Sequence, residues 1–266
     1  MRAAPIKILE MEKLRVNGVA LEVERLDGAA GRQLAPIVFL HEGLGSVSMW
    51  RDWPRQVCAS TRRAGVVYSR RGYGQSDPVA DVRDSGRLAP DYMHREAWEV
   101  LPELLDTLAI RQPVLLGHSD GGSIALLHAS RHPVQACIVM APHVVVEDVS
   151  LRSIEAARDA YPAELRQRLQ RFHDDVDGAF WQWNDVWLDP AFRNFDIRVD
   201  CRRISAPLLA IQGTDDAYGT MRQIEEIAPT RGNVRMEKLA QCGHSPHKDQ
   251  ADLTCRLVTE FLAPLS

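Results

Sequence analysis

A serine stands between two glycines at Gly117, Ser119 and Gly121, and an apolar run that is too short for a helix leads into it. An apolar pattern with helical spacing follows Gly122, so the serine is expected at a tight turn from a strand into a helix. Side chains at the flanking positions would collide with neighbouring backbone, which is why such a turn needs glycines. The turn would raise the hydroxyl above the sheet and aim the backbone N–H of Asp120 at a developing oxyanion.

A serine at such a turn needs two partners before it can act as a nucleophile. Because its hydroxyl hardly ionises near neutral pH, an imidazole must accept the proton and a carboxylate must fix the tautomer of the imidazole. The adjacent acids Asp215 and Asp216 follow a buried strand, and His244 lies in a Gly-His turn before the last helix. Two glycines around a serine also occur as an ordinary strand-to-helix loop, so the pattern predicts a nucleophile only together with these partners.

Buried strands alternate with amphipathic helices along most of the chain. An Asn17-Gly18 turn is expected to join two N-terminal strands, because Asn-Gly readily adopts the two positive φ values of a tight hairpin. Further strands are expected at 36–40, 66–69, from 113 to the serine turn, at 136–140, 207–212 and around 234–238. Helices are expected at 50–63, 91–108, after Gly122, near 220–227 and at the C-terminus. This alternation predicts an α/β fold with a mostly parallel sheet covered on both faces.

The alternation stops between positions 143 and 204. This stretch has helical patterns at 152–161, 163–176 and 178–188 and no convincing strand. It is too long for a connection between a strand and a helix, so we expect a small helical subdomain. The chain is therefore predicted to consist of a core formed by 1–142 and 205–266, with the helical subdomain of 143–204 between the two parts.

Composition and charge exclude several classes of protein. The formal net charge is −4 and the arginines are scattered, so we expect neither a nucleic-acid nor an anionic membrane partner. Charged residues interrupt positions 1–14 and no apolar run could span a bilayer, so no signal peptide and no membrane segment are expected. Five irregularly spaced cysteines fit reduced thiols and a cytoplasmic location. Cys242, His244 and His247 match no zinc spacing, so no metal is expected.

Four motifs, in the same order as in the family, make the sequence resemble the α/β-hydrolase superfamily along nearly its whole length. They are His41-Glu42-Gly43, the stretch 71–76, the serine turn at 117–121, and 213–216 followed by Gly243-His244. The resemblance implies an eight-stranded, mostly parallel sheet flanked by helices, with catalytic residues at the carboxyl ends of strands. It also implies a helical lid inserted after the sixth strand, which is where residues 143–204 fall.

The resemblance implies which residues do the chemistry. In that family the nucleophile, the acid and the base follow one another along the chain, so Ser119 and His244 take the first and last of these roles. The family's G-x-x-D spacing, counted from Gly213, implies Asp216 as the acid. Asp215 would then face solvent or cap the next helix.

The loop that begins at His41 is expected to hold a second oxyanion donor. Alignment with the family's His-Gly-x pattern implies the backbone N–H of Gly43, with Leu44 as the fallback, acting beside the N–H of Asp120. His41 itself is expected to order this loop without transferring a proton.

Two acidic residues depart from the family pattern. Glu42 stands where glycine is common, and Asp120 stands where an apolar residue is frequent. If both carboxylates bordered the pocket, they would disfavour an anionic acyl group. In the alternative interpretation, Glu42 pairs with Arg70 or Arg71, and Asp120 caps its own helix.

Five residues are expected around the substrate pocket, namely Leu44, His143, Phe180, Trp183 and Trp187. The last three share one face of a helix in the predicted subdomain. Such an aromatic stripe can dock the subdomain on the core or roof an apolar pocket. His143 follows the sixth strand and either approaches the pocket or has a structural role.

The predicted function is that of a serine hydrolase without a cofactor. We expect it to cleave a small to medium carboxylic ester, lactone or thioester through an acyl-enzyme on Ser119. Hydrolysis of a carbon–carbon bond in ring-cleavage products is an alternative within the same class. A ligand-sensing module or a cofactor-free oxygenase on the same fold is the alternative from another class. A small molecule is the expected partner, and a homodimer is possible.

Overall fold

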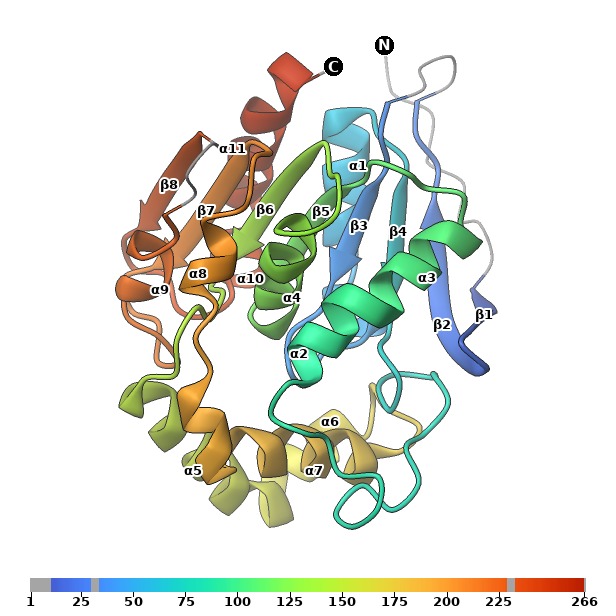
Figure 1. The fold of residues 1–266 in the computed structure, drawn as a ribbon, viewed down its shortest axis with the longest axis vertical. Helices are drawn as coiled ribbons and strands as arrows, with labels where there is room; N and C mark the ends of the chain where they lie inside the picture. The colour runs from blue at the N-terminus through green and yellow to red at the C-terminus, as the bar shows by residue number, and fades with distance from the viewer. Residues whose placement is uncertain (1–10, 30–33, 229–232, 266) are drawn as a thin grey trace.

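The computed structural model describes residues 11–29, 34–228 and 233–265. Its centre is a sheet of eight strands (Figure 1). They are β1 (Glu12–Val16), β2 (Val19–Leu26), β3 (Ile37–Leu40), β4 (Gly65–Tyr68), β5 (Val114–His118), β6 (Ala136–Met140), β7 (Leu208–Gly213) and β8 (Val234–Leu239). The order across the sheet is β1-β2-β4-β3-β5-β6-β7-β8. β3 to β8 run parallel, whereas β2 pairs antiparallel with β1 and β4. The predicted α/β fold with an eight-stranded, mostly parallel sheet is confirmed.

Helices cover both faces of the sheet. α1 (Trp53–Thr61) and α11 (Ala251–Leu262) pack on one face, and α2 (Tyr92–Arg95), α3 (Leu101–Thr107) and α4 (Asp120–Ala129) pack on the other. Successive side chains of a strand point to opposite faces of the sheet. Leu116 of β5 therefore packs in the hydrophobic cluster under α1 and α11, and Leu115 packs in the cluster under α2, α3 and α4. Because both faces are covered, β5 and β6 are buried along their whole length, which explains their uninterrupted apolar sequence.

The predicted helix at 91–108 is present but irregular. A π-helical turn (Glu96–Val100) separates α2 from α3 immediately before Pro102. Proline lacks the N–H that a helix needs, and its ring crowds the carbonyl four residues earlier, so the wider turn accommodates it. A second π turn (Tyr161–Leu165) contains Pro162 and a non-helical residue, Ala163, with φ −99° and ψ −115°.

Residues 143–204, which we call the helical insertion, lie between β6 and β7 and contain helices but no strand. Their helical segments are α5 (Asp148–Ala160), the second π turn, α6 (Arg166–Leu169), α7 (Val176–Trp187), a 3-10 turn (Pro190–Asn194) and α8 (Arg198–Cys201). The predicted helix at 163–176 has the wrong extent. α6 ends at Leu169, and the Asp175 side chain accepts a hydrogen bond from the Gly178 N–H to begin α7. α5, α6 and α7 lie together beyond one end of the sheet (Figure 1).

The five cysteines of the chain are all buried free thiols. Burial raises the pKa of Cys58 and of Cys201 to about 12, so these thiols stay protonated and unreactive near neutral pH. None of the helices in the described ranges combines the length and the apolar character needed to cross a membrane.

Candidate active site

Ser119 occupies a strained turn between β5 and α4. Its φ of 53° and ψ of −120° lie in a region that side chains other than glycine rarely adopt. A Cβ atom at Gly117 would lie 2.1 Å from the carbonyl oxygen of Gly121, and one at Gly121 would lie 2.1 Å from that of Leu40. The Ser119 N–H donates to the carbonyl oxygen of Met140 in β6 (2.9 Å). Both glycines are therefore required by close backbone approach, and the serine is fixed at the carboxyl end of the sheet.

Three predicted residues from distant parts of the chain meet at this turn. His244, in the loop after β8, places Nε2 2.9 Å from the Ser119 hydroxyl oxygen. Its Nδ1 lies 2.9 Å from both carboxylate oxygens of Asp216, which follows β7. The neighbouring Asp215 is exposed and accepts a hydrogen bond from the Thr214 hydroxyl instead. The structure thus brings together Ser119, His244 and Asp216, and it leaves Asp215 outside.

Asp216 is held in its ionised form. Burial raises the pKa of this carboxyl, but the hydrogen bonds from His244 and from the Tyr218 N–H (2.7 Å) outweigh burial and bring it below its usual value. Gln212 Nε2 donates a further bond to Asp216 (2.6 Å). An ionised Asp216 holds the proton of His244 on Nδ1, which leaves Nε2 free to accept the proton of Ser119.

Two backbone N–H groups near Ser119 lack an internal acceptor. Among the described residues, neither the Gly43 N–H nor the Asp120 N–H donates to a protein group. Both residues line the same cavity as Ser119, and the second begins α4. Gly43 lies directly against the indole of Trp183, because a Cβ atom there would be 2.1 Å from Trp183 Nε1. Two donors are therefore available to an oxygen atom bound above the serine.

A cavity of about 300 Å³, which we call the serine cavity, opens at Ser119 between the ends of the strands and the helical insertion. Of the predicted pocket residues, Leu44, His143, Trp183 and Trp187 line it. Phe180 does not line it, because its ring stacks on Tyr161 with centroids 3.6 Å apart, inside the insertion. Helical spacing identified the buried face of α7 but not which part of that face reaches the cavity. Residues that were not predicted complete the wall, namely Met49, Ile154, Leu165, Arg168, Leu169, Tyr218 and Ser245.

His143 approaches the serine but stays neutral. Its Nε2 lies 3.5 Å from the Ser119 hydroxyl oxygen, farther than that of His244, and its ring packs on Trp187 with centroids 4.8 Å apart. Burial lowers the pKa of His143 to about 3. The Ser123 hydroxyl donates a hydrogen bond to the His143 carbonyl oxygen and accepts one from the His143 N–H. His143 is therefore a fixed, neutral residue in the wall of the cavity.

The predicted pairing of Glu42 with an arginine is wrong. Its carboxylate lies 3.2 Å from Lys248 Nζ and 3.5 Å from His118 Nδ1. Arg70 instead donates to the main-chain oxygens of His41 (2.6 Å) and Glu42 (3.1 Å). The Arg70 guanidinium therefore supports the backbone of the loop that carries Gly43. The Glu42 carboxylate is neutralised by Lys248, which lies near the C-terminus.

The predicted helix cap at Asp120 is also wrong. Its buried carboxylate accepts hydrogen bonds from Tyr92 Oη (2.5 Å) and Trp187 Nε1 (3.3 Å) and lies 3.9 Å from Arg70. Burial raises the pKa of Asp120, and the Arg70 guanidinium opposes this increase. Because Ser119 is the residue that precedes α4, the Asp120 side chain is free to tie α4 to α2 and to the helical insertion.

Two further histidines hold the loops around the site. His41 Nε2 accepts a hydrogen bond from the Arg70 N–H (3.0 Å), so its Nδ1 donates to the Glu42 carbonyl oxygen (2.6 Å). Both ring nitrogens are thereby occupied, which fits a role in ordering the loop. His118 Nε2 donates to the carbonyl oxygen of His244 (2.7 Å) and fixes the backbone of the candidate base. Across the described ranges, no group of three or more His, Cys, Asp or Glu residues is arranged to hold a metal ion.

The buried neutral histidines predict that acid weakens the fold. Burial lowers the pKa of His143 to about 3 and that of His128 to about 4, against about 6.5 in an unfolded chain. Below pH 6.5 the unfolded state therefore binds more protons, so stability is complete above that pH and falls as pH decreases toward 4. Each such histidine contributes a slope of up to about 1.4 kcal/mol per pH unit.

Urea denaturation between pH 5 and 8 measures this slope as the free energy of unfolding. In His128→Gln, the side-chain amide can still donate to the Ala97 carbonyl oxygen that His128 contacts. The slope of the free energy of unfolding against pH is expected to decrease by the contribution of this one histidine. A free energy of unfolding that stays constant from pH 7.5 to pH 5 would contradict the prediction.

A parallel sheet covered by helices, with a serine, a histidine and an aspartate joined by hydrogen bonds at the ends of its strands, defines an α/β protein of the hydrolase type. A family model described as "Alpha/beta hydrolase family" matches residues 37–257. The chain belongs to the alpha/beta hydrolase family.

Several known proteins with similar sequences or structures are named as hydrolases or lactonases. The chain is 26% identical over 260 residues to the mouse "Serine hydrolase BPHL", with 94% of this chain and 85% of that protein covered. It is 24% identical over 261 residues to the "2-hydroxymuconate semialdehyde hydrolase" of Pseudomonas sp. CF600, covering 86% and 87%. The crystal structure of the enol-lactonase from Burkholderia xenovorans LB400 is similar in fold, with a TM-score of 0.72, 20% identity and coverage of 94% and 99%.

Proposed function

We propose that the protein is a serine hydrolase that cleaves a small to medium carboxylic ester, lactone or thioester. One observation carries the proposal: a continuous chain of 2.9 Å contacts runs from Asp216 through His244 to the Ser119 hydroxyl, which faces a cavity. The two unpaired N–H groups of Gly43 and Asp120 supply what a tetrahedral intermediate requires. The named relatives support hydrolysis as the class of reaction.

In the proposed reaction, Ser119 Oγ attacks the carbonyl carbon of the substrate while His244 Nε2 takes the hydroxyl proton. The carbonyl oxygen becomes negative and accepts hydrogen bonds from the Gly43 and Asp120 N–H groups. The intermediate collapses, the bond to the alcohol or thiol breaks, and His244 returns the proton to that leaving group. Water, activated by His244, then attacks the acyl-enzyme and releases the acid with regeneration of Ser119. Asp216 stabilises the imidazolium that forms in both halves.

We further propose that the helical insertion acts as a lid over the serine cavity. Trp183 and Trp187 of α7 and Ile154 of α5 line the cavity together with Ser119. A volume of about 300 Å³ suits a small to medium acyl group.

Labelling with a fluorophosphonate, followed by peptide mapping, tests the nucleophile. The reagent is expected to modify the peptide that contains Ser119, and His244→Ala is expected to prevent this because the hydroxyl loses its base. Turnover of p-nitrophenyl acetate separates an enzyme from a ligand sensor, and oxygen uptake would reveal an oxygenase. Labelling of another serine, or turnover without labelling, would refute the assignment.

Hydrolysis of a carbon–carbon bond in ring-cleavage products is the second candidate, favoured by the similarity to the 2-hydroxymuconate semialdehyde hydrolase. A substrate panel that contains such a product and p-nitrophenyl esters of several chain lengths compares the two. A kcat/KM for the ring-cleavage product far above those of all esters would replace ester cleavage as the proposed reaction.

A further inference from the structure

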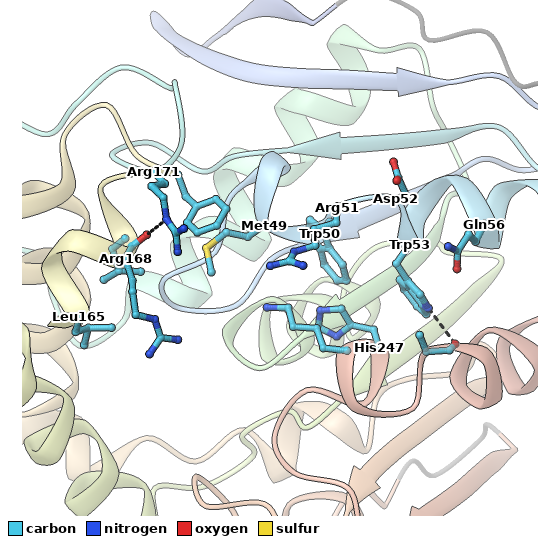
Figure 2. A pocket seen from close by; sticks show the side chains of 14 residues that line it. Met49, Trp50, Arg51, Asp52, Trp53, Gln56, Leu165, Arg168, Arg171 and His247 are labelled. Atoms are coloured by element: carbon cyan, nitrogen blue, oxygen red, sulfur yellow. Dashed lines mark hydrogen bonds between the residues drawn. The ribbon is translucent and has the colours of Figure 1, made fainter.

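A second cavity of about 530 Å³, which we call the arginine cavity, adjoins the serine cavity. It lies between the core and the helical insertion, as Figure 2 shows. Its walls come from residues 49–56, from 165–172 and from α10 (Pro246–Asp249) with the residue that begins α11. Four residues line both cavities, namely Met49, Leu165, Arg168 and Leu169. The arginine cavity and the serine cavity are therefore neighbours that meet at these four side chains.

Positive charge predominates in the arginine cavity. Arg51 approaches from the core, and Arg168 and Arg171 come from the insertion on the other side (Figure 2). All three are exposed, and within the described ranges no carboxylate lies at ion-pair distance from any of them. Lys248 also lines the cavity but is paired with Glu42. Three uncompensated guanidinium groups around one space attract an anion, which would remove their mutual repulsion.

The acidic residues near this space are already neutralised. Asp52, the one carboxylate in the described wall of the arginine cavity, pairs with Arg55 (2.7 Å). In the serine cavity, Glu42 pairs with Lys248 and Asp120 lies beside Arg70. A cation lies beside each of these carboxylates, which weakens the objection that they would repel an anionic substrate.

Two further features of the wall of the arginine cavity are unusual. The rings of Trp50 and His247 pack 4.8 Å apart in the wall of the cavity. Trp50 Nε1 and both ring nitrogens of His247 are buried without a hydrogen-bond partner, whereas buried polar atoms are normally paired. Arg51 has φ 53° and ψ −138°, a backbone conformation that is costly for any residue with a side chain. A long basic side chain therefore stands at a position where glycine would fit more easily.

We propose that the arginine cavity binds an oxyanion group of the substrate, a carboxylate or a phosphate, while the ester carbonyl of the same molecule lies at Ser119. The planar guanidinium groups of Arg51, Arg168 and Arg171 can each donate paired, charge-assisted hydrogen bonds to two oxygens of a carboxylate or of a phosphate. This inference rests on the proposed function and narrows it to esters that carry a second, negatively charged end.

A matched pair of substrates tests the inference directly. p-Nitrophenyl hydrogen suberate carries a carboxylate at its far end, and p-nitrophenyl methyl suberate is its neutral counterpart. The wild-type protein is expected to hydrolyse the anionic ester with a kcat/KM about tenfold higher, because each exposed charge pair contributes modestly and three act together. Added sodium chloride is expected to reduce this preference. Adipate and sebacate half-esters then locate the optimal distance, and an ω-phosphonate analogue distinguishes phosphate from carboxylate as the natural group.

The triple variant Arg51→Gln/Arg168→Gln/Arg171→Gln is expected to lose the preference, mainly through a higher KM for the anionic ester. The preference is a ratio measured with two esters on one variant, so an effect of Arg168→Gln on the wall of the serine cavity acts on both esters. Arg111→Gln/Arg152→Gln/Arg158→Gln removes the same charge from exposed positions that line none of the described cavities, and it should keep the preference. Thermal melting of all three proteins verifies that they are folded. Equal kcat/KM for the two esters in the wild type, or a preference that survives in the first triple variant, would overturn the inference.

Failure of the proposed function gives a different result, because then neither ester is hydrolysed. Calorimetric titration with monomethyl suberate still decides the question about the arginine cavity in that case. Binding to the wild type and to the control variant, with loss in the Arg51/Arg168/Arg171 variant, supports an oxyanion site. The absence of binding to the wild type, or equal binding to all three proteins, rejects it.

Discussion

Replacement of Ser119 with alanine is expected to lower kcat for ester hydrolysis by about 10⁶-fold, the loss seen when a nucleophile and base that act as one unit are broken. The reason is the geometry at the Ser119 turn: in the described part of the chain, the Ser119 hydroxyl oxygen is the one hydroxyl that lies 2.9 Å from His244 Nε2 and also faces the serine cavity. Without it no acyl-enzyme can form, and catalysis is limited to what the two N–H donors give a water molecule.

The measurement is steady-state turnover of a p-nitrophenyl ester, together with a burst experiment at high enzyme concentration. The double variant Ser119→Ala/His244→Ala is expected to be no slower than either single variant, because the two side chains work as a unit. Ser205→Ala serves as the matched control, since this serine is exposed and lies outside the serine cavity. If Ser119→Ala retained near-wild-type turnover, the whole assignment of the site would be wrong.

Replacement of Asp216 with asparagine is expected to lower kcat by about 10⁴-fold, as is typical when the acid of such a triad becomes an amide. The side chain keeps its size but loses the charge that stabilises the imidazolium. In the wild-type protein, the carboxylate oxygens of Asp216 accept hydrogen bonds from Gln212 Nε2, from the Tyr218 N–H and from His244 Nδ1. An amide has one acceptor oxygen for these donors, so its NH₂ group would face a donor and favour the wrong tautomer of His244.

Asp215→Asn is the control for this prediction, because the two acids are neighbours in the sequence and differ only in where they point. Asp215 is exposed and bonds to Thr214, so its amide variant is expected to keep kcat within about twofold, as for most surface substitutions. The result to look for is the ratio of the two variants' kcat values under identical conditions. A large loss in Asp215→Asn with a small loss in Asp216→Asn would exchange the roles of the two residues.

The turn at Ser119 could be predicted because its sequence signals are local: a short apolar strand, two glycines and a helix start lie within a few residues. The close approach at Gly117 is also local, since it is to Gly121, whereas the one at Gly121 is to Leu40 in the neighbouring strand β3. The parallel sheet was predictable for the same reason, since strands buried on both faces are apolar without interruption. His244 and Asp216 could be selected by their order and spacing in the chain.

The partners of the charged residues could not be predicted. Glu42 lies 206 positions from Lys248, and no pattern in the sequence relates the two. Arg70, the nearer candidate, donates instead to the main-chain oxygens of His41 and Glu42, and no pattern in the sequence indicates these contacts either. Phe180 shows the same limit for packing: periodicity assigns a side chain to a buried face, whereas the kink around Pro162 decides what that face meets.

The contact between Gly43 and Trp183 bears on attempts to build chimeras from this protein. α7 rests so closely on two glycines that a methyl group at Gly43 would overlap the Trp183 indole, and one at Gly72 would come within 2.4 Å of the Gln182 amide. If residues 143–204 are exchanged for the corresponding segment of a homologue, the loops that contain Gly43 and Gly72 must therefore be exchanged together with them. The transplantable module is the insertion plus the two loops beneath it, and a graft of the helices alone would deform the strand ends on which they sit.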